Sequence, residues 1–294
     1  MKGVIPRTLP RGSRARGAAL TLGVIGATLI IVVPAVASIS SNESPTVAIS
    51  GEFVPARLPR SRPAPITLGI GFTSEFPSTH TAPVLTQIAL EFRRNLVFNA
   101  EGLPRCTLHR LLASYASPVQ SCRRSLVGHG MVVSEVPLPS TTGLTRVEGE
   151  LRAYYGLYEG QPWVLAQVTS RTAGLTYVIP FELKARGQNH ETTLEVPSPV
   201  MRLLPGRYIC DRNSPGCYGT HHFRGIYGRI LSFELSLHRT FSYDGERQSF
   251  VSADCPARGN QLSAGFEGVS LQYSEGASQG EESATILGKC EVSR

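Results

Sequence analysis

Apolar and polar residues alternate strictly along residues 231–238. The apolar residues are Leu231, Phe233, Leu235 and Leu237, and the residues between them are Ser232, Glu234, Ser236 and His238. A period of two is typical of a β-strand with one face in the core and one in solvent. Asp244-Gly245 follows, the dipeptide most typical of a tight turn, and a return strand passes through Phe250 and Val251. The pattern predicts a β-hairpin.

A similar pattern occurs earlier, along residues 88–102. Apolar residues recur up to Phe98, and a turn is expected at Asn99–Gly102. When the two segments are aligned, Leu90 matches Leu235, Phe92 matches Leu237, Phe98 matches Tyr243 and Asn99 matches Asp244. Each segment is then followed by a cysteine, Cys106 or Cys255. We interpret the match as an internal duplication of one strand-hairpin-strand unit.

Many short alternating stretches, together with 29 Gly and 21 Pro, favour an all-β fold with antiparallel, β-sandwich-like packing. At His109–Tyr115 we expect one short turn or helix. The duplication divides the chain into two related halves, residues 46–140 and 141–294. The second half is longer because it contains inserted strands around residues 175–183 and 192–196 and a loop between Cys210 and Cys217.

The N-terminal residues have the order of a signal peptide. Five cations (Lys2, Arg7, Arg11, Arg14 and Arg16) precede an apolar run at Ala18–Val33, which ends in the small residues of Pro34–Ala37. We expect a signal peptide at residues 1–37 with cleavage after Ala37, or an uncleaved N-terminal anchor helix, followed by a flexible tether at residues 38–45. A secreted or cell-envelope location follows from either reading.

The formal charge of +7 is concentrated in this leader. Without its five cations, 24 Lys and Arg residues stand against 22 Asp and Glu residues, so the mature chain is nearly neutral. The high isoelectric point is therefore no argument for nucleic-acid binding, and we expect none. Contact with a membrane is expected only through an uncleaved N-terminal segment.

Six cysteines all lie beyond the leader, and an even number in an oxidising compartment predicts three disulfides. Fifteen pairings are possible. We favour the pairs that are nearest in sequence: Cys106 with Cys122, Cys210 with Cys217, and Cys255 with Cys290.

Three blocks carry a family resemblance. They are Leu58–Arg60 with Pro65–Leu68, Gly102–Cys106, and Arg239–Tyr243 with Ser252–Ala257. In these blocks the chain resembles a family of exported, uncharacterised proteins of high-GC Gram-positive bacteria. The resemblance implies a signal peptide, β-strands and cysteines that flank both halves. It implies no activity, so no residue takes a role from it.

Candidate catalytic and metal-binding groups are few. The Gly-x-Ser-x-Gly motif of α/β hydrolases does not occur in the sequence. His221 and His222 lie near Cys210, Asp211 and Cys217, so they are weak candidates for a zinc site. Adjacent residues of a strand point in opposite directions, however, and a disulfide loop with surface histidines is the favoured reading. Even cysteine parity also argues against Cys217 as a catalytic thiolate. We expect no cofactor.

Glu148 and Glu150 share one face of a predicted strand and are the best candidates for a pair of catalytic carboxylates. Arg152 continues the same face, while Val147, Gly149 and Leu151 form the other. This pattern favours a solvated outer face over an acid–base pair.

Aromatic residues cluster around a predicted hairpin at Glu159–Pro162. Tyr154, Tyr158 and Trp163 flank it, and exposed rings there could stack on a ligand such as a sugar. Packing of the rings across neighbouring strands is the favoured alternative.

These observations favour a non-enzymatic binding or structural module, secreted or associated with the cell envelope. Its partner stays open, with an envelope or extracellular polymer as one candidate. The alternative is an extracellular hydrolase of envelope or polysaccharide polymers that uses Glu148, Glu150 or the His221 region.

Overall fold

The computed structural model divides the chain into two compact units, residues 1–32 and 33–294, and all of the residues that it describes belong to the second. These are residues 35–39, 46–60, 62–75, 84–92, 95–113, 120–138, 143–186, 191–196, 205–209, 220–224, 229–255, 263–264, 266–275, 278–284, 288–289 and 291–292. The predicted N-terminal helix lies outside them.

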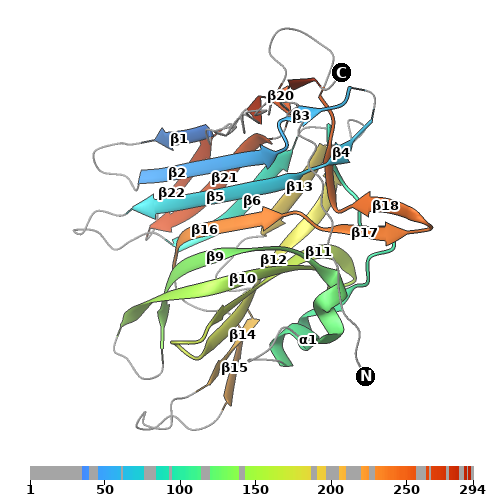
Figure 1. Cartoon of the computed structure of the whole chain (residues 1–294). Coiled ribbons are helices and arrows are strands. Elements are labelled where there is room, and N and C mark those ends of the chain that lie inside the picture. Colours follow the sequence, from blue (N-terminus) through green and yellow to red (C-terminus); the bar gives the residue numbers. More distant parts are fainter. Residues whose placement is uncertain are drawn as a thin grey trace, which may run out of the picture. The chain divides into compact units, whose positions relative to one another are not determined.

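One large antiparallel sheet dominates the described residues (Figure 1). Along the sheet the strands are β1 (Ala35–Ile39), β2 (Thr46–Val54), β5 (Thr67–Glu75), β16 (Arg229–Leu237), β9 (Leu126–Pro137), β10 (Leu144–Tyr158), β11 (Gln161–Ser170), β12 (Leu175–Arg186), β13 (Glu191–Val196), β6 (Val84–Phe92), β21 (Phe266–Glu275) and β22 (Ser278–Ala284). This arrangement confirms the predicted all-β, antiparallel fold class.

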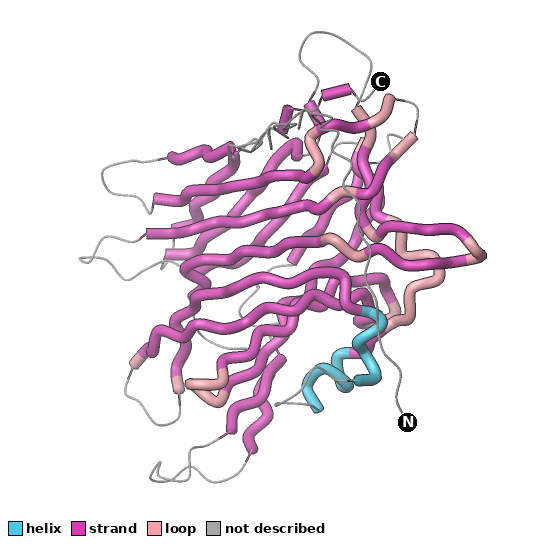
Figure 2. The backbone as a smooth tube through the Cα atoms, in the orientation of Figure 1, coloured by secondary structure: helices cyan, strands magenta, loops and turns pink. Residues whose placement is uncertain are grey.

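Shorter elements flank the sheet (Figure 2). β14 (Pro205–Ile209) pairs with β12 and with β15 (Thr220–Arg224), and β8 (Cys106–Thr107) runs parallel to β10. Four smaller sheets join β17 (Thr240–Tyr243) to β18 (Glu246–Ser249), β19 (Val251–Ala253) to β4 (Ala64–Pro65) and β7 (Leu96–Phe98), β20 (Ser263–Ala264) to β23 (Gly288–Lys289), and β24 (Glu291–Val292) to β3 (Arg57–Leu58). Among the described residues the helical elements are α1 (Leu108–Ala113), which confirms the short helix expected there, and the 3-10 helix η1 (Gln120–Ser125).

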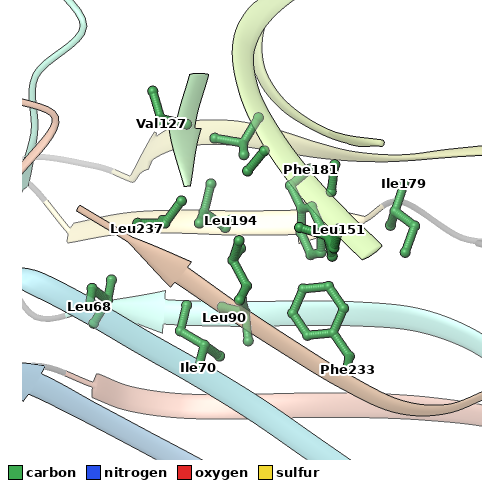
Figure 3. Close-up of a cluster of buried hydrophobic side chains, with 14 of the residues drawn as sticks. Leu68, Ile70, Leu90, Val127, Leu151, Ile179, Phe181, Leu194, Phe233 and Leu237 are labelled. Carbon is green, nitrogen blue, oxygen red and sulfur yellow. The ribbon is translucent and has the colours of Figure 1, made fainter. Parts of the chain in front are cut away.

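The sheet curls back on itself, so that residues from distant strands share one core (Figure 3). Phe233 of β16 stacks on Phe72 of β5 at 5.8 Å between ring centroids, and it contacts Phe181 of β12 at 5.5 Å. Gly130 of β9 faces this core, where a Cβ atom would collide with the main-chain oxygen of Glu234. A glycine is therefore needed where β9 and β16 approach each other.

The alternation that predicted β16 is confirmed with one change. Phe233, Leu235 and Leu237 are buried, whereas Leu231 is only half-buried. The pairing with β9 shifts register between Ile230 and Ser232, so Ile230 is buried in place of Leu231. Because side chains of a strand alternate between its two faces, a one-residue irregularity of this kind moves the residues before it to the opposite face of the sheet.

Two predicted hairpins are confirmed. Tyr243 pairs with Glu246 across Asp244-Gly245, and Tyr158 pairs with Gln161 across Glu159-Gly160. Both loops have two residues with positive φ, 51° and 78° in the first and 52° and 83° in the second. Such values match the right-handed twist of the flanking strands.

Strands from the two predicted halves alternate along the sheet. β16, from residues 141–294, lies between β5 and β9, which come from residues 46–140. The two aligned segments also pair differently, since β7 pairs with β19 whereas β17 pairs with β18. The described parts of both halves thus share a core, and the duplication stays a prediction.

The disulfide between Cys106 and Cys122 is confirmed, with their Cα atoms 5.3 Å apart. Cys255 is also disulfide-bonded. Cys210, Cys217 and Cys290 lie outside the described residues, so the other two pairings stay predictions.

β1 spans the position where cleavage was predicted, after Ala37. Its pairing with β2 runs from Ala35 opposite Gly51 to Ile39 opposite Val47. Ser38 and Ile39, the start of the predicted tether, are therefore part of a strand, and residues 40–45 lie outside the described residues.

Candidate functional site

The face of the sheet that points away from the core, here called the outer face, has a covered region over β10–β12. The disulfide and α1 pack there against Tyr154, Trp163 and Leu165. The side-chain amide of Gln167 donates a 2.6 Å hydrogen bond to the main-chain oxygen of Leu111, which ties α1 to β11. This end of the outer face is therefore closed by the protein itself.

The three aromatic residues predicted as ligand-stacking candidates lie together in this covered region. Tyr158 meets Trp163 edge-on, with ring centroids 5.1 Å apart, but Tyr154 and Trp163 are only 0% and 4% exposed. Burial also raises the pKa of the Tyr154 phenol, and the neighbouring Arg152 opposes part of that rise. A ring without an exposed face cannot stack on a sugar, so the arrangement supports the alternative, packing across strands.

The rest of the outer face is open where β2, β5, β16, β9 and β10 lie side by side (Figure 1). A depression of about 670 Å³, here called the outer hollow, crosses these five strands. Strand pairing arranges its side chains in two rows. One row is Ser50, Gly71, Glu234, Met131 and Glu150, and the other is Glu52, Gly69, Ser236, His129 and then Arg152 at its rim.

Two glycines of β5 leave room for the outer hollow. Gly69 and Gly71 occupy outward positions of β5 and place no side chain there. A Cβ atom at Gly69 would lie 2.8 Å from Cγ of Glu52, and one at Gly71 would lie 2.8 Å from Oγ of Ser50 and 3.6 Å from Cγ of Glu234. Side chains of both neighbouring strands therefore lean over β5.

Carboxylates dominate the charge of the outer hollow. Glu52, Glu150 and Glu234 line it, and the described lining residues include no Lys or Arg. Glu150 is paired with Arg152 at 2.7 Å, both on β10. In the part of the chain that the structure describes, Glu52 and Glu234 have no hydrogen-bond or ion-pair partner.

Other carboxylates of the sheet are held by cations. Glu135 pairs with Arg229 at 3.2 Å, and Lys184 bridges Glu182 and Glu195 at 3.0 Å each. Glu52 and Glu234 differ from these carboxylates in having no such cation among the described residues.

Two histidines lie at one end of the outer hollow. His129 of its lining and His238 meet edge-on, with ring centroids 4.8 Å apart. Nδ1 of His238 lies 3.4 Å from the main-chain oxygen of Ser236. Among the described residues, no group of three or more His, Cys, Asp or Glu side chains could hold a metal ion.

Glu148 and Glu150 occupy the outer face as predicted, exposed between the buried Val147, Gly149 and Leu151. The structure separates their surroundings, because Glu150 lines the outer hollow and Glu148 does not. Gly69, Gly71, Glu52 and Glu234 were not predicted as site residues from the sequence. The available signal was the repeat of glycine at alternate positions in Leu68–Phe72.

His221 and His222 lie in β15, opposite Tyr208 and Arg207 of β14. Their side chains are not described, and Cys210, Asp211 and Cys217 lie outside the described residues. The zinc hypothesis therefore gains no support and stays a weak prediction.

No family model, curated protein or solved structure matches the chain. Among the described residues, no helix combines the length and apolar character needed to cross a bilayer.

Proposed function

We propose that this chain is a non-enzymatic binding module that works outside the cytoplasm, secreted or in the cell envelope, and that its binding surface is the outer hollow. The observation that carries the proposal is the depression of about 670 Å³ on an otherwise regular sheet face. Side chains of five paired strands line it, and strands hold binding groups in place better than loops do.

The location outside the cytoplasm is supported by the cysteines and the leader. Cys106 and Cys122 are both fully buried, and their bond joins β8 to η1, the elements on either side of α1. Structural disulfides of this kind persist in oxidising compartments. The basic and apolar order of residues 1–37 and the resemblance to exported proteins of high-GC Gram-positive bacteria agree with this placement.

Binding is favoured over catalysis by the form of the outer hollow. It is an open depression across strands, and the glutamates that lean over it project from regular strand positions. Glycoside hydrolysis needs one carboxyl group that stays protonated while its partner is ionised. Glu150, the lining member of the pair considered from the sequence, is instead ion-paired with Arg152 at 2.7 Å, and Glu148 lies outside the outer hollow.

A matched pair of variants tests the proposal. Ser236→Tyr places a bulky side chain in the outer hollow, whereas Ser232→Tyr places the same side chain on the same face of β16 but outside it. Binding of the purified mature protein to peptidoglycan, wall polysaccharides and envelope proteins should be lost in Ser236→Tyr and kept in Ser232→Tyr. Equal binding by both variants, with unchanged melting temperatures, would remove the outer hollow from the function. Turnover of any of these polymers would favour the hydrolase alternative.

A further inference from the structure

We infer that the outer hollow binds an extended peptide segment that carries Lys or Arg side chains. The inference rests on the proposed function and names the class of ligand for the same surface. It is carried by charge, by spacing and by the apolar contact that the surface offers.

Charge selects a cationic ligand. Glu52 and Glu234 lean over the two glycines from opposite sides, and neither has a partner among the described residues. A carboxylate accepts charge-assisted hydrogen bonds most strongly from guanidinium and ammonium groups. Since the described lining supplies neither group, the ligand is the source of the missing positive charge.

Spacing selects a ligand with more than one cation. Glu52 and Glu234 come from β2 and β16, which flank β5. Neighbouring strands lie about 4.8 Å apart, and Glu52 and Glu234 are also offset by two positions along the strands, because they lie opposite Gly69 and Gly71. Their backbones are therefore about 12 Å apart. An extended peptide rises about 3.3 Å per residue and its alternate side chains share one face, so residues four positions apart lie on the same face about 13 Å from each other. Two basic residues at that spacing reach both carboxylates.

The remaining lining favours a peptide over a small ion. Met131 lies opposite Glu234 and is 46% exposed, so its thioether is available to the aliphatic stem of a Lys or Arg side chain. The hydroxyls of Ser50 and Ser236 lie in the same depression and can hydrogen-bond to a peptide backbone. The open shape gives contact along a chain and does not enclose a single ion.

Fluorescence anisotropy with labelled peptides tests the inference. The probe is a Gly/Ser peptide with Arg at its first and fifth positions, and the control peptide has Glu at those positions. The full mature protein should bind only the Arg peptide, and the binding should weaken as NaCl rises. Glu52→Gln and Glu234→Gln should each weaken it roughly two- to five-fold, as expected for one partly exposed charge pair, and the double variant should weaken it more.

Glu148→Gln is the matched control, because Glu148 is an exposed carboxylate on the same face that does not line the outer hollow. It should leave the affinity unchanged. Equal binding of the Glu peptide, or an affinity that does not respond to Glu52→Gln and Glu234→Gln, would overturn the inference. Spermidine that binds more tightly than the Arg peptide would also overturn it, in favour of a polyamine.

The outcome separates the two proposals. Loss of polymer binding in Ser236→Tyr without any binding of the Arg peptide would leave the binding function standing and refute the ligand class. Binding of the Arg peptide that Ser236→Tyr does not change would refute the outer hollow as the site in both proposals.

Discussion

Tyr177 of β12 donates a 3.2 Å hydrogen bond to Ser134 of β9 inside the core. Both side chains are almost fully buried, at 1% and 2% exposed. β9 and β12 are not neighbours in the sheet, since β10 and β11 separate them. The hydrogen bond therefore links strands across the curl of the sheet, in surroundings where an unpaired hydroxyl is costly.

Removal of the phenol oxygen tests this link. Tyr177→Phe should destabilise the protein by about 1–2 kcal/mol, because Ser134 then has a buried hydroxyl without this partner. The double variant with Ser134→Ala should recover part of the loss. Urea unfolding of the wild type, both single variants and the double variant measures the coupling; strictly additive losses would show that the hydrogen bond contributes nothing.

The same phenol predicts an alkaline pH dependence. Burial raises the pKa of Tyr177 from 10.0 to about 12, although the hydrogen bond with Ser134 acts in the opposite direction. The native state keeps the proton at a pH where the unfolded chain loses it, so this stabilisation is complete below pH 10 and declines as the pH rises towards 12. When the pH rises from about 9 to about 11, the free energy of unfolding of the wild type should fall by about 1 kcal/mol more than that of Tyr177→Phe. Equal losses in urea titrations would contradict the prediction.

The Cys106–Cys122 disulfide should stabilise the covered region of the outer face. The bond closes a loop with a sequence separation of 16, for which the chain-entropy model gives about 3 kcal/mol. Replacement of both cysteines by serine should lower the free energy of unfolding by about that amount. Hydrogen exchange should increase first in α1 and in β10 near Tyr154, while β5 and β16 stay protected; uniform loss of protection would show that the bond stabilises the whole sheet.

Two glycine variants separate a close backbone approach from an open depression. Gly130→Ala places Cβ against the main-chain oxygen of Glu234, and this oxygen can move only if the backbone of β16 moves. We therefore expect the free energy of unfolding to fall by more than about 2 kcal/mol. At Gly69 the nearest atoms belong to the flexible side chain of Glu52, so Gly69→Ala should cost less than about 1 kcal/mol. Thermal denaturation compares the two; equal costs would mean that β9 and β16 can separate freely.

The sequence predicted what depends on local pattern. Alternation located the buried face of β16, Asp244-Gly245 located a hairpin, and the short loop between Cys106 and Cys122 located a disulfide. The same alternation placed Glu148 and Glu150 on the outer face correctly. Each of these features is decided by residues that are close together in the chain.

The features that sequence could not supply depend on strand register. β16 pairs with β5 and β9, although more than 90 residues separate it from either strand. When the order of the strands is not known, Gly69 and Gly71 are only residues of low strand propensity. The sequence then gives no reason to place Glu52 and Glu234 on either side of them. The irregularity at Leu231 arises in the same way, because the pairing with β9 decides which residue faces inwards.

The position of β1 has a consequence for export. If processing occurs after Ala37, it removes three of the five residues of β1 and leaves β2 without its neighbour along residues 49–51. Unpaired amide and carbonyl groups along such a stretch are a template on which another extended chain can add itself as a strand. Maturation would then do more than release the protein from the membrane: it would uncover a docking edge on the same strand that carries Glu52.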